Sequence, residues 1–309
     1  MSALEDAVAT KRDRLLGILG VSFATVAWGL VPLVLKEVEM PTMAFASYRL
    51  WLGVVIYAVA VAVTGRRPSW STIRVCALGG VFFAADVSLS FNAFRLTTVA
   101  NATIIGALAP VFIAIGASRW FGERFSRRDL IFMFASLLGV VLVALGSTGS
   151  PARSLAGDLC AAASTISWTS YWLYSKRVRR SVSTLDYLST VMLVAAICVT
   201  VVTAASGISL APPQGMDWLW VVLLAAIPGA IGHVMVAWSH GHVEAWLASL
   251  ITQGQPVVGS AAAWLLLGES LTLLTIVGGV IVLVSTAVIA VKEGLTATEH
   301  DAEGAVDAG

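Results

Sequence analysis

The sequence has few charged residues for its length. Only 12% of its 309 residues are Asp, Glu, Lys or Arg, whereas about a quarter of the residues in an average soluble domain are charged. Apolar residues make up 58%. Lys and Arg form no basic stripe, so we expect no nucleic-acid partner. This composition excludes an ordinary soluble domain and predicts an integral membrane protein that is surrounded by lipid.

Cysteine and clustered metal ligands are also scarce. The three cysteines, Cys76, Cys160 and Cys198, lie in apolar stretches and indicate small buried side chains, not a disulfide framework or a metal site. In the run from His240 to Glu244, only the two end residues share a helical face, and no third ligand is evident. We therefore predict no metal, no cofactor and no enzymatic activity. No Walker A motif is present, which excludes ATP as the energy source.

Long apolar runs dominate what remains. A bilayer core about 30 Å thick needs about 20 residues per helix. Charges, prolines and glycines divide the chain into ten such segments, which predict an all-α integral membrane fold: 15–35, 42–64, 73–94, 98–121, 130–147, 156–175, 186–206, 218–240, 245–267 and 272–291. The acidic tail at 293–309 is rich in Gly and Ala and is expected to be disordered.

The connections between these segments predict the orientation. Short cytoplasmic loops retain Lys and Arg. Of the 19 Lys and Arg residues, fifteen fall on the side of the N-terminus, three fall on the other side, and Arg49 lies within the second helix. We therefore expect a multi-pass protein of the cell (inner) membrane, with both termini and the tail in the cytoplasm.

Two sets of residues recur along the chain. A Pro and a Gly-Glu pair occur twice, 146 residues apart: Pro110 with Glu123, and Pro256 with Glu269. A Gly, a Trp and a Lys occur twice, 140 residues apart: Gly17, Trp28 and Lys36, then Gly157, Trp168 and Lys176. The first five helices (1–147) thus match the last five (156–291), and because five is odd, the halves are inverted repeats. Each glutamate is expected to cap the next helix.

These residues resemble the EamA branch of the drug/metabolite transporter superfamily over nearly the whole chain. The family's marks, a Pro followed by Gly-Glu in helices four and nine and a Trp in helices one and six, are present twice. The resemblance implies ten helices, a central cavity and export or exchange of small metabolites such as amino acids.

The leading functional hypothesis is a secondary active transporter with alternating access to this cavity. A uniporter or pore without proton coupling is the alternative, and a membrane-embedded enzyme is a weaker one. The expected partners are a small-molecule substrate, the lipid bilayer and, in the coupled case, protons. Because the two halves are fused, a monomer suffices for a pathway, and a dimer is the alternative.

Ionisable residues inside the predicted helices are the first candidates for the site, because burying a charge in a membrane is costly. Asp86 shares a helical face with Ser90 and is a candidate for binding a substrate amine or a proton; the alternative is a structural pair with Arg49. Arg49, at a similar depth, is a candidate for a substrate carboxylate or a snorkelling side chain. His233 is one residue from the repeat counterpart of Asp86 and is either a proton carrier or a packing histidine.

Aromatic and amide side chains complete the predicted site. Trp28, Trp168 and Tyr171 are expected to line the cavity, with interfacial anchoring as the alternative. Asn101, Gln253 and Gln255 lie near the prolines of helices four and nine, where they either face the solute path or join helices by hydrogen bonds. Pro110 and Pro256 are expected to kink these helices.

Overall fold

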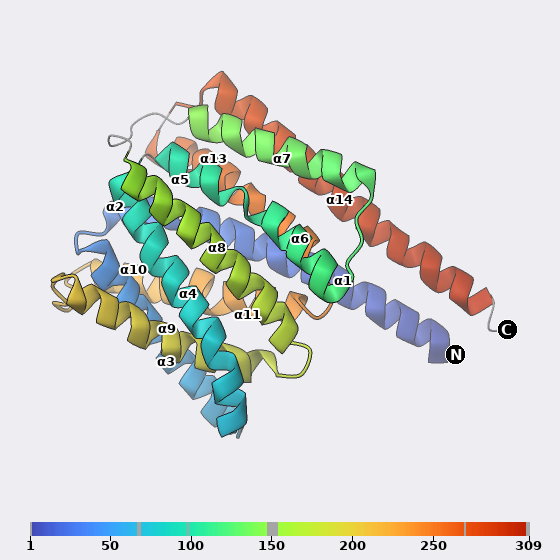
Figure 1. The fold of residues 1–309 in the computed structure, drawn as a ribbon, viewed down its shortest axis with the longest axis horizontal. Helices are drawn as coiled ribbons and strands as arrows, with labels where there is room; N and C mark the ends of the chain where they lie inside the picture. Colours follow the sequence, from blue (N-terminus) through green and yellow to red (C-terminus); the bar gives the residue numbers. More distant parts are fainter. Residues whose placement is uncertain (1, 67–68, 98, 147–153, 269, 307–309) are drawn as a thin grey trace.

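The computed structural model describes residues 2–66, 69–97, 99–146, 154–268 and 270–306, and this part of the chain contains helices and no strands (Figure 1). Nine helical stretches in it are long and apolar enough to cross a membrane. The chain is therefore a multi-pass helical membrane protein.

The helices of residues 1–147 follow the predicted segments. They are α1 (Ser2–Gly29), α2 (Val31–Glu37), α3 (Thr42–Val63), α4 (Trp70–Leu96), α5 (Val99–Gly106), α6 (Ala109–Phe121) and α7 (Arg127–Gly146). Local signals set several of these boundaries. For example, the Ser69 hydroxyl accepts a hydrogen bond from the Thr72 amide at the start of α4.

The second part of the chain contains more interruptions. Its elements are α8 (Leu155–Val178), α9 (Thr184–Ala205), α10 (Asp217–Leu224), the π-helix η1 (Ala225–Gly232), α11 (His233–Ser239), α12 (Ala245–Ile251), the 3₁₀ turn η2 (Thr252–Gly254), α13 (Gln255–Leu267) and α14 (Leu273–Val306). Elements α10, η1 and α11 form one stretch across the bundle, as do α12, η2 and α13.

Helix α8 is the predicted segment that is not among the nine apolar stretches. It has 24 residues, but it is rich in Ser and Thr and carries Asp158 near its start and Lys176 near its end. It packs against α4, α5, α6 and α12. Protein neighbours on several sides make a polar helix tolerable here, because its hydroxyl groups find hydrogen-bond partners.

The two prolines of the sequence repeat lie at helix interruptions. Proline lacks the amide proton that a continuous helix needs. Pro110 is the second residue of α6, after the break that follows α5, and Pro256 is the second residue of α13, after η2. Both of these helices end at a glycine in the left-handed region, Gly122 (φ 69°) and Gly268 (φ 67°). The repeated sequence pattern thus corresponds to a repeated local structure.

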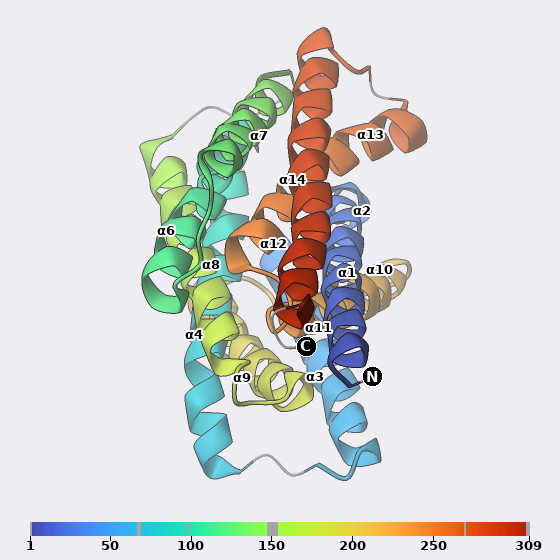
Figure 2. The same ribbon diagram turned by 90° about the vertical axis from the view of Figure 1, so that its right-hand side faces the viewer.

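Helices α7 and α14 pair along one side of the bundle (Figures 1 and 2). At their crossing, a Cβ atom on Gly139 would lie 2.7 Å from the Gly278 carbonyl oxygen, and one on Gly278 would lie 2.5 Å from the Gly139 oxygen. Only glycine permits this approach. Helix α14 continues to Val306, through residues 293–306, for which the sequence predicted a disordered tail.

Candidate functional site

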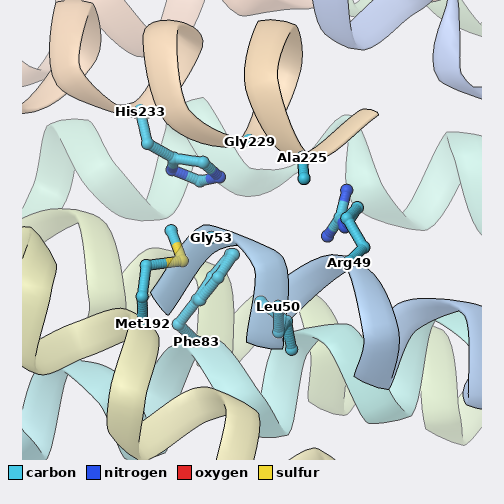
Figure 3. Close-up of a pocket in the computed structure, with 8 residues that line it drawn as sticks. All are labelled: Arg49, Leu50, Gly53, Phe83, Met192, Ala225, Gly229 and His233. Atoms are coloured by element: carbon cyan, nitrogen blue, oxygen red, sulfur yellow. The ribbon is translucent and has the colours of Figure 1, made fainter. Parts of the chain in front are cut away.

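A small pocket lies between α3, α4, α9 and the η1–α11 segment (Figure 3). Its volume is about 10 Å³, which is room for about one water molecule. The residues that line it are Arg49, Leu50, Gly53, Phe83, Met192, Ala225, Gly229 and His233. Arg49 and His233, both predicted from the sequence as site residues, therefore meet here from α3 and α11.

Arg49 brings a positive charge into this pocket. The charge interacts electrostatically with that of Asp86. Among the contacts of the described residues, however, no ion pair within 4.0 Å joins the two side chains, and no hydrogen bond to Arg49 is present. The guanidinium group thus lines the pocket, and a direct ion pair with Asp86, the structural alternative from the sequence, is not present among the described contacts.

Asp86 is held by α8 instead. The Ser164 hydroxyl donates a hydrogen bond of 2.6 Å to Oδ1 of Asp86. Ser164 is buried, and a hydrogen bond to a carboxylate is shorter and stronger than one between neutral groups. Sequence reasoning missed Ser164, because nothing local distinguishes it from the other serines of α8.

Aromatic side chains surround the same region. We call Trp28, Phe83, Trp168, Tyr171 and His233 the aromatic cluster. The ring centroid of His233 lies 5.1 Å from Trp28 and 4.9 Å from Phe83. Tyr171 lies 5.2 Å from Phe83 and 5.5 Å from Trp168. The structure therefore brings the predicted cavity aromatics together with His233, next to the pocket.

The π-helix η1 forms one wall, and the sequence did not predict it. It contains Pro228, and its backbone carbonyl groups accept hydrogen bonds from side chains of other helices. Trp28 Nε1 donates to the Pro228 oxygen at 2.9 Å, and the Tyr57 hydroxyl donates to the Ala230 oxygen at 3.0 Å. π-Helical turns are frequent at functional sites. The available signal was the Pro-Gly pair at 228–229.

Other predicted site residues lie elsewhere or bond locally. The Ser90 hydroxyl donates to the Val87 oxygen within α4. Asn101 donates to Oδ1 of Asp158 at 3.2 Å, near the start of α8. Gln253 is buried and donates to the Ala107 oxygen at 2.9 Å, where the two interrupted helices cross. Gln255 is half-buried at the start of α13. For Asn101 and Gln253, these contacts match the alternative of interhelical hydrogen bonding.

The run at 240–244 connects α11 and α12. His240 shares a hydrogen bond with the Ser175 hydroxyl (3.0 Å), and Glu244 pairs with Arg14 (2.8 Å). Within the described residues, no group of three or more His, Cys, Asp or Glu side chains is placed to hold a metal ion.

The sequence had suggested that Glu123 caps the helix that follows it, but in the structure it caps a different helix. Its carboxylate accepts hydrogen bonds from the Ala245 amide (3.0 and 3.1 Å) and so caps α12. Glu269, its repeat counterpart, lies outside the described residues.

Comparison with known proteins gives consistent results. The EamA-like transporter family matches twice, at residues 15–145 and 155–291. An uncharacterized transporter, YdfC, of Bacillus subtilis (strain 168) is 26% identical over 238 residues, which are 76% of this chain and 78% of that protein. A probable amino-acid metabolite efflux pump of Escherichia coli (strain K12) is 25% identical over 288 residues, covering 89% and 93%.

One solved crystal structure of a protein has the same fold. Its TM-score is 0.76 at 21% sequence identity, and the match covers 88% of this chain and 96% of the other.

Proposed function

Because this chain belongs to the EamA-like transporter family, we propose that it is a secondary active transporter that exports or exchanges small metabolites such as amino acids. The observation that carries the proposal is the pocket. It combines a guanidinium group without an ion-pair partner among the described contacts, a nearby carboxylate and an aromatic cluster. Arg49, Asp86 and His233 each lie within a candidate membrane span, where charges mark solute paths.

The site suits a solute with two charges. An α-carboxylate would bind the Arg49 guanidinium, and an α-ammonium group would interact with Asp86 and the aromatic cluster. The Escherichia coli relative that is named as a probable amino-acid metabolite efflux pump supports this class. A pocket of about 10 Å³ is far smaller than an amino acid, so the helices must move apart to admit one. That requirement favours alternating access over an open pore.

Ten spanning helices in two inverted halves are part of this proposal, with α8 as the tenth span. The double family match and the equivalent interruptions at Pro110 and Pro256 support it. Packing agrees as well, because α4 contacts α9 and their repeat counterparts, η1 and α3, are also in contact. A single chain then contains a whole pathway, so a monomer suffices.

We place both ends of the chain in the cytoplasm and the protein in the inner membrane. The excess of Lys and Arg on the N-terminal side supports this orientation. The first turns of α1 and the last turns of α14 also lie at the same end of the bundle (Figures 1 and 2). Arg14, Glu123, Lys176 and Glu244 then lie at the cytoplasmic end.

Reconstitution tests the function directly. Liposomes loaded with a pool of amino acids and other metabolites would be assayed for release, with and without an inward proton gradient. We expect saturable release and counterflow, and stimulation by the gradient in wild type but not in Asp86→Asn. Arg66→Gln, which removes an exposed charge that does not line the pocket, is the matched control. Equal release by the wild type and Asp86→Asn would make Asp86 structural and the protein a uniporter. Release without saturation would indicate a pore.

A further inference from the structure

A buried ion pair lies at the end of the bundle where α6 and α8 finish. Lys176 Nζ is 2.6 Å from Oε1 of Glu123, and the two side chains are only 10% and 8% exposed. Glu123 follows Gly122, whose left-handed conformation turns the chain out of α6. The pair therefore joins the residue that follows the C-terminal cap of α6, in the first half of the chain, to the last turn of α8 in the second half.

Both members of this pair also hold the connection between α11 and α12. Glu123 accepts from the Ala245 amide, and Lys176 donates to the Val243 oxygen at 2.7 Å. Next to them, Arg14 of α1 pairs with Glu244 at 2.8 Å. We call Arg14, Glu123, Lys176 and Glu244 the clamp. Its bonds hold together segments from α1, α6, α8 and the start of α12.

Burial differs between the two ends of the molecule. All seven residues of α12 are buried, beneath α1, α6, α8 and α14. Their counterparts in the sequence repeat, 146 positions earlier, begin at residue 99. Of the counterparts with described side chains, only Ala102 is buried, while Asn101, Thr103, Ile104 and Ile105 are partly exposed. The clamp end is thus tightly closed, whereas the opposite end is packed more loosely.

We propose that the clamp is the closure of the cytoplasmic end of the transport path, and that Glu123 and Lys176 position α12 so that the pocket is sealed from that side. This inference rests on the proposed function. For a solute to enter from the cytoplasm, α12 must separate from α6 and α8, and the pair must break. A buried charge that loses its partner is strongly unfavourable unless water reaches it. Separation of the pair is therefore coupled to wetting of the path.

The competing explanation is a permanent staple that stays intact in every conformation. The two explanations differ in what loss of the pair does to access. If the clamp is a closure, weakening it raises the population of the state that is open to the cytoplasm, while the fold is kept. If it is a staple, access to α12 does not change until the protein unfolds.

Cysteine labelling distinguishes the two. In a background with Cys76, Cys160 and Cys198 replaced by Ala, Ser249→Cys places a reporter on α12, one turn beyond the clamp. Ser249 is 1% exposed, and among the described contacts its hydroxyl bonds only within its own helix, to the Trp246 oxygen. An impermeant maleimide would be applied to inverted membrane vesicles, where it reaches the cytoplasmic side, and to right-side-out vesicles.

We expect Glu123→Gln and Lys176→Met to speed labelling in inverted vesicles by about fivefold or more, the size of a modest shift in a two-state equilibrium. Labelling in right-side-out vesicles should not rise. The matched control is Arg66→Gln, which removes another ion pair, Arg66 with Asp186 (3.1 Å), whose arginine side chain is 48% exposed. It should label like the wild type.

Unchanged labelling in both variants overturns the proposal, and so does an increase that is equal from both sides, which indicates general loosening. If neither variant folds, Arg14→Gln decides, because it removes the more exposed pair of the clamp. Arg14→Gln should also speed labelling of Ser249→Cys from the cytoplasmic side. Labelling at the same rate as in the protein with an intact clamp would overturn the proposal. The labelling assay needs no solute. The clamp proposal can therefore be refuted while saturable transport is observed, or supported while no transport is found.

Discussion

Trp28 and Trp168, which occupy equivalent positions in the sequence repeat, meet edge to face with ring centroids 5.8 Å apart and ring planes at 82°. They lie on α1 and α8, 140 residues apart in the chain. Gln253 and Ala107 show a similar relationship, because they are 146 residues apart and are joined by a hydrogen bond. Equivalent residues of the repeat are thus in direct contact with each other in the folded protein.

The hydrogen bond from Ser164 should affect how Asp86 takes part in solute binding and in the pH dependence of transport. Ser164→Ala removes a hydrogen bond to a carboxylate, which is worth about 1.5–3 kcal/mol. We expect the KM for the transported solute to rise about tenfold or more, with a changed pH profile of transport. Ser164→Thr keeps the hydroxyl and should restore both. An alanine variant with wild-type kinetics would show that the bond has no role in transport.

Arg49 should select solutes that carry a carboxylate. Arg49→Gln keeps a polar side chain but removes the positive charge from the pocket. Competition assays in liposomes should show that a free amino acid no longer inhibits transport better than the corresponding amine. If the amino acid stays the stronger inhibitor, the guanidinium group does not bind the carboxylate.

Trp28 should stabilise the π-helix through its indole NH group. Trp28→Phe keeps an aromatic ring but leaves the Pro228 carbonyl without this donor, at a cost of about 1–3 kcal/mol. The Tm in detergent should fall. Trp120→Phe, at an exposed tryptophan at the end of α6, is the control and should leave Tm unchanged. An equal Tm for both variants would argue against a role for this hydrogen bond.

The crossing of α7 and α14 should not accept a side chain. Gly278→Ala would place a Cβ 2.5 Å from the Gly139 oxygen, and overpacking of this kind costs about 1–3 kcal/mol. Gly106→Ala is the matched control, since outside its own stretch of helix no atom of the described residues lies within 4 Å of a Cβ there. Thermal unfolding in detergent should show a lower Tm for Gly278→Ala only. A similar Tm for the two variants would mean that the helices separate at little cost.

Gln253 should act on stability, not on solute binding. Gln253→Leu removes the bond to the Ala107 oxygen and buries that carbonyl without this partner, at about 1–3 kcal/mol. Gln255→Leu is the comparison, because among the described contacts its side chain has no hydrogen bond. We expect a lower Tm for the first variant and an unchanged KM for both. A large rise in KM for Gln253→Leu would indicate that this residue faces the solute path.

Much of the architecture could be predicted from local patterns. The apolar runs predicted the spans, and nine of them are confirmed as long apolar helices in the described residues. The Pro and Gly-Glu pattern predicted the family, which is confirmed by the double match. Asp86, Arg49 and His233 were found because a charged or titratable group in an apolar run is conspicuous. Ser164 and Tyr57 were missed because an isolated Ser or Tyr is common in such helices.

Sequence alone therefore determined what depends on the chain's local composition: a helical membrane protein, its interruptions at Pro110 and Pro256, and the ionisable residues it carries inside the membrane. Tertiary structure decided which partner each of these groups has. Glu123 caps α12, not the helix after it, and Asp86 bonds to Ser164, not to Arg49. The reason is physical. Hydropathy is a property of each segment, whereas a hydrogen bond needs two atoms within about 3 Å and an ion pair within about 4 Å, and helix packing brings together residues that are far apart in the chain.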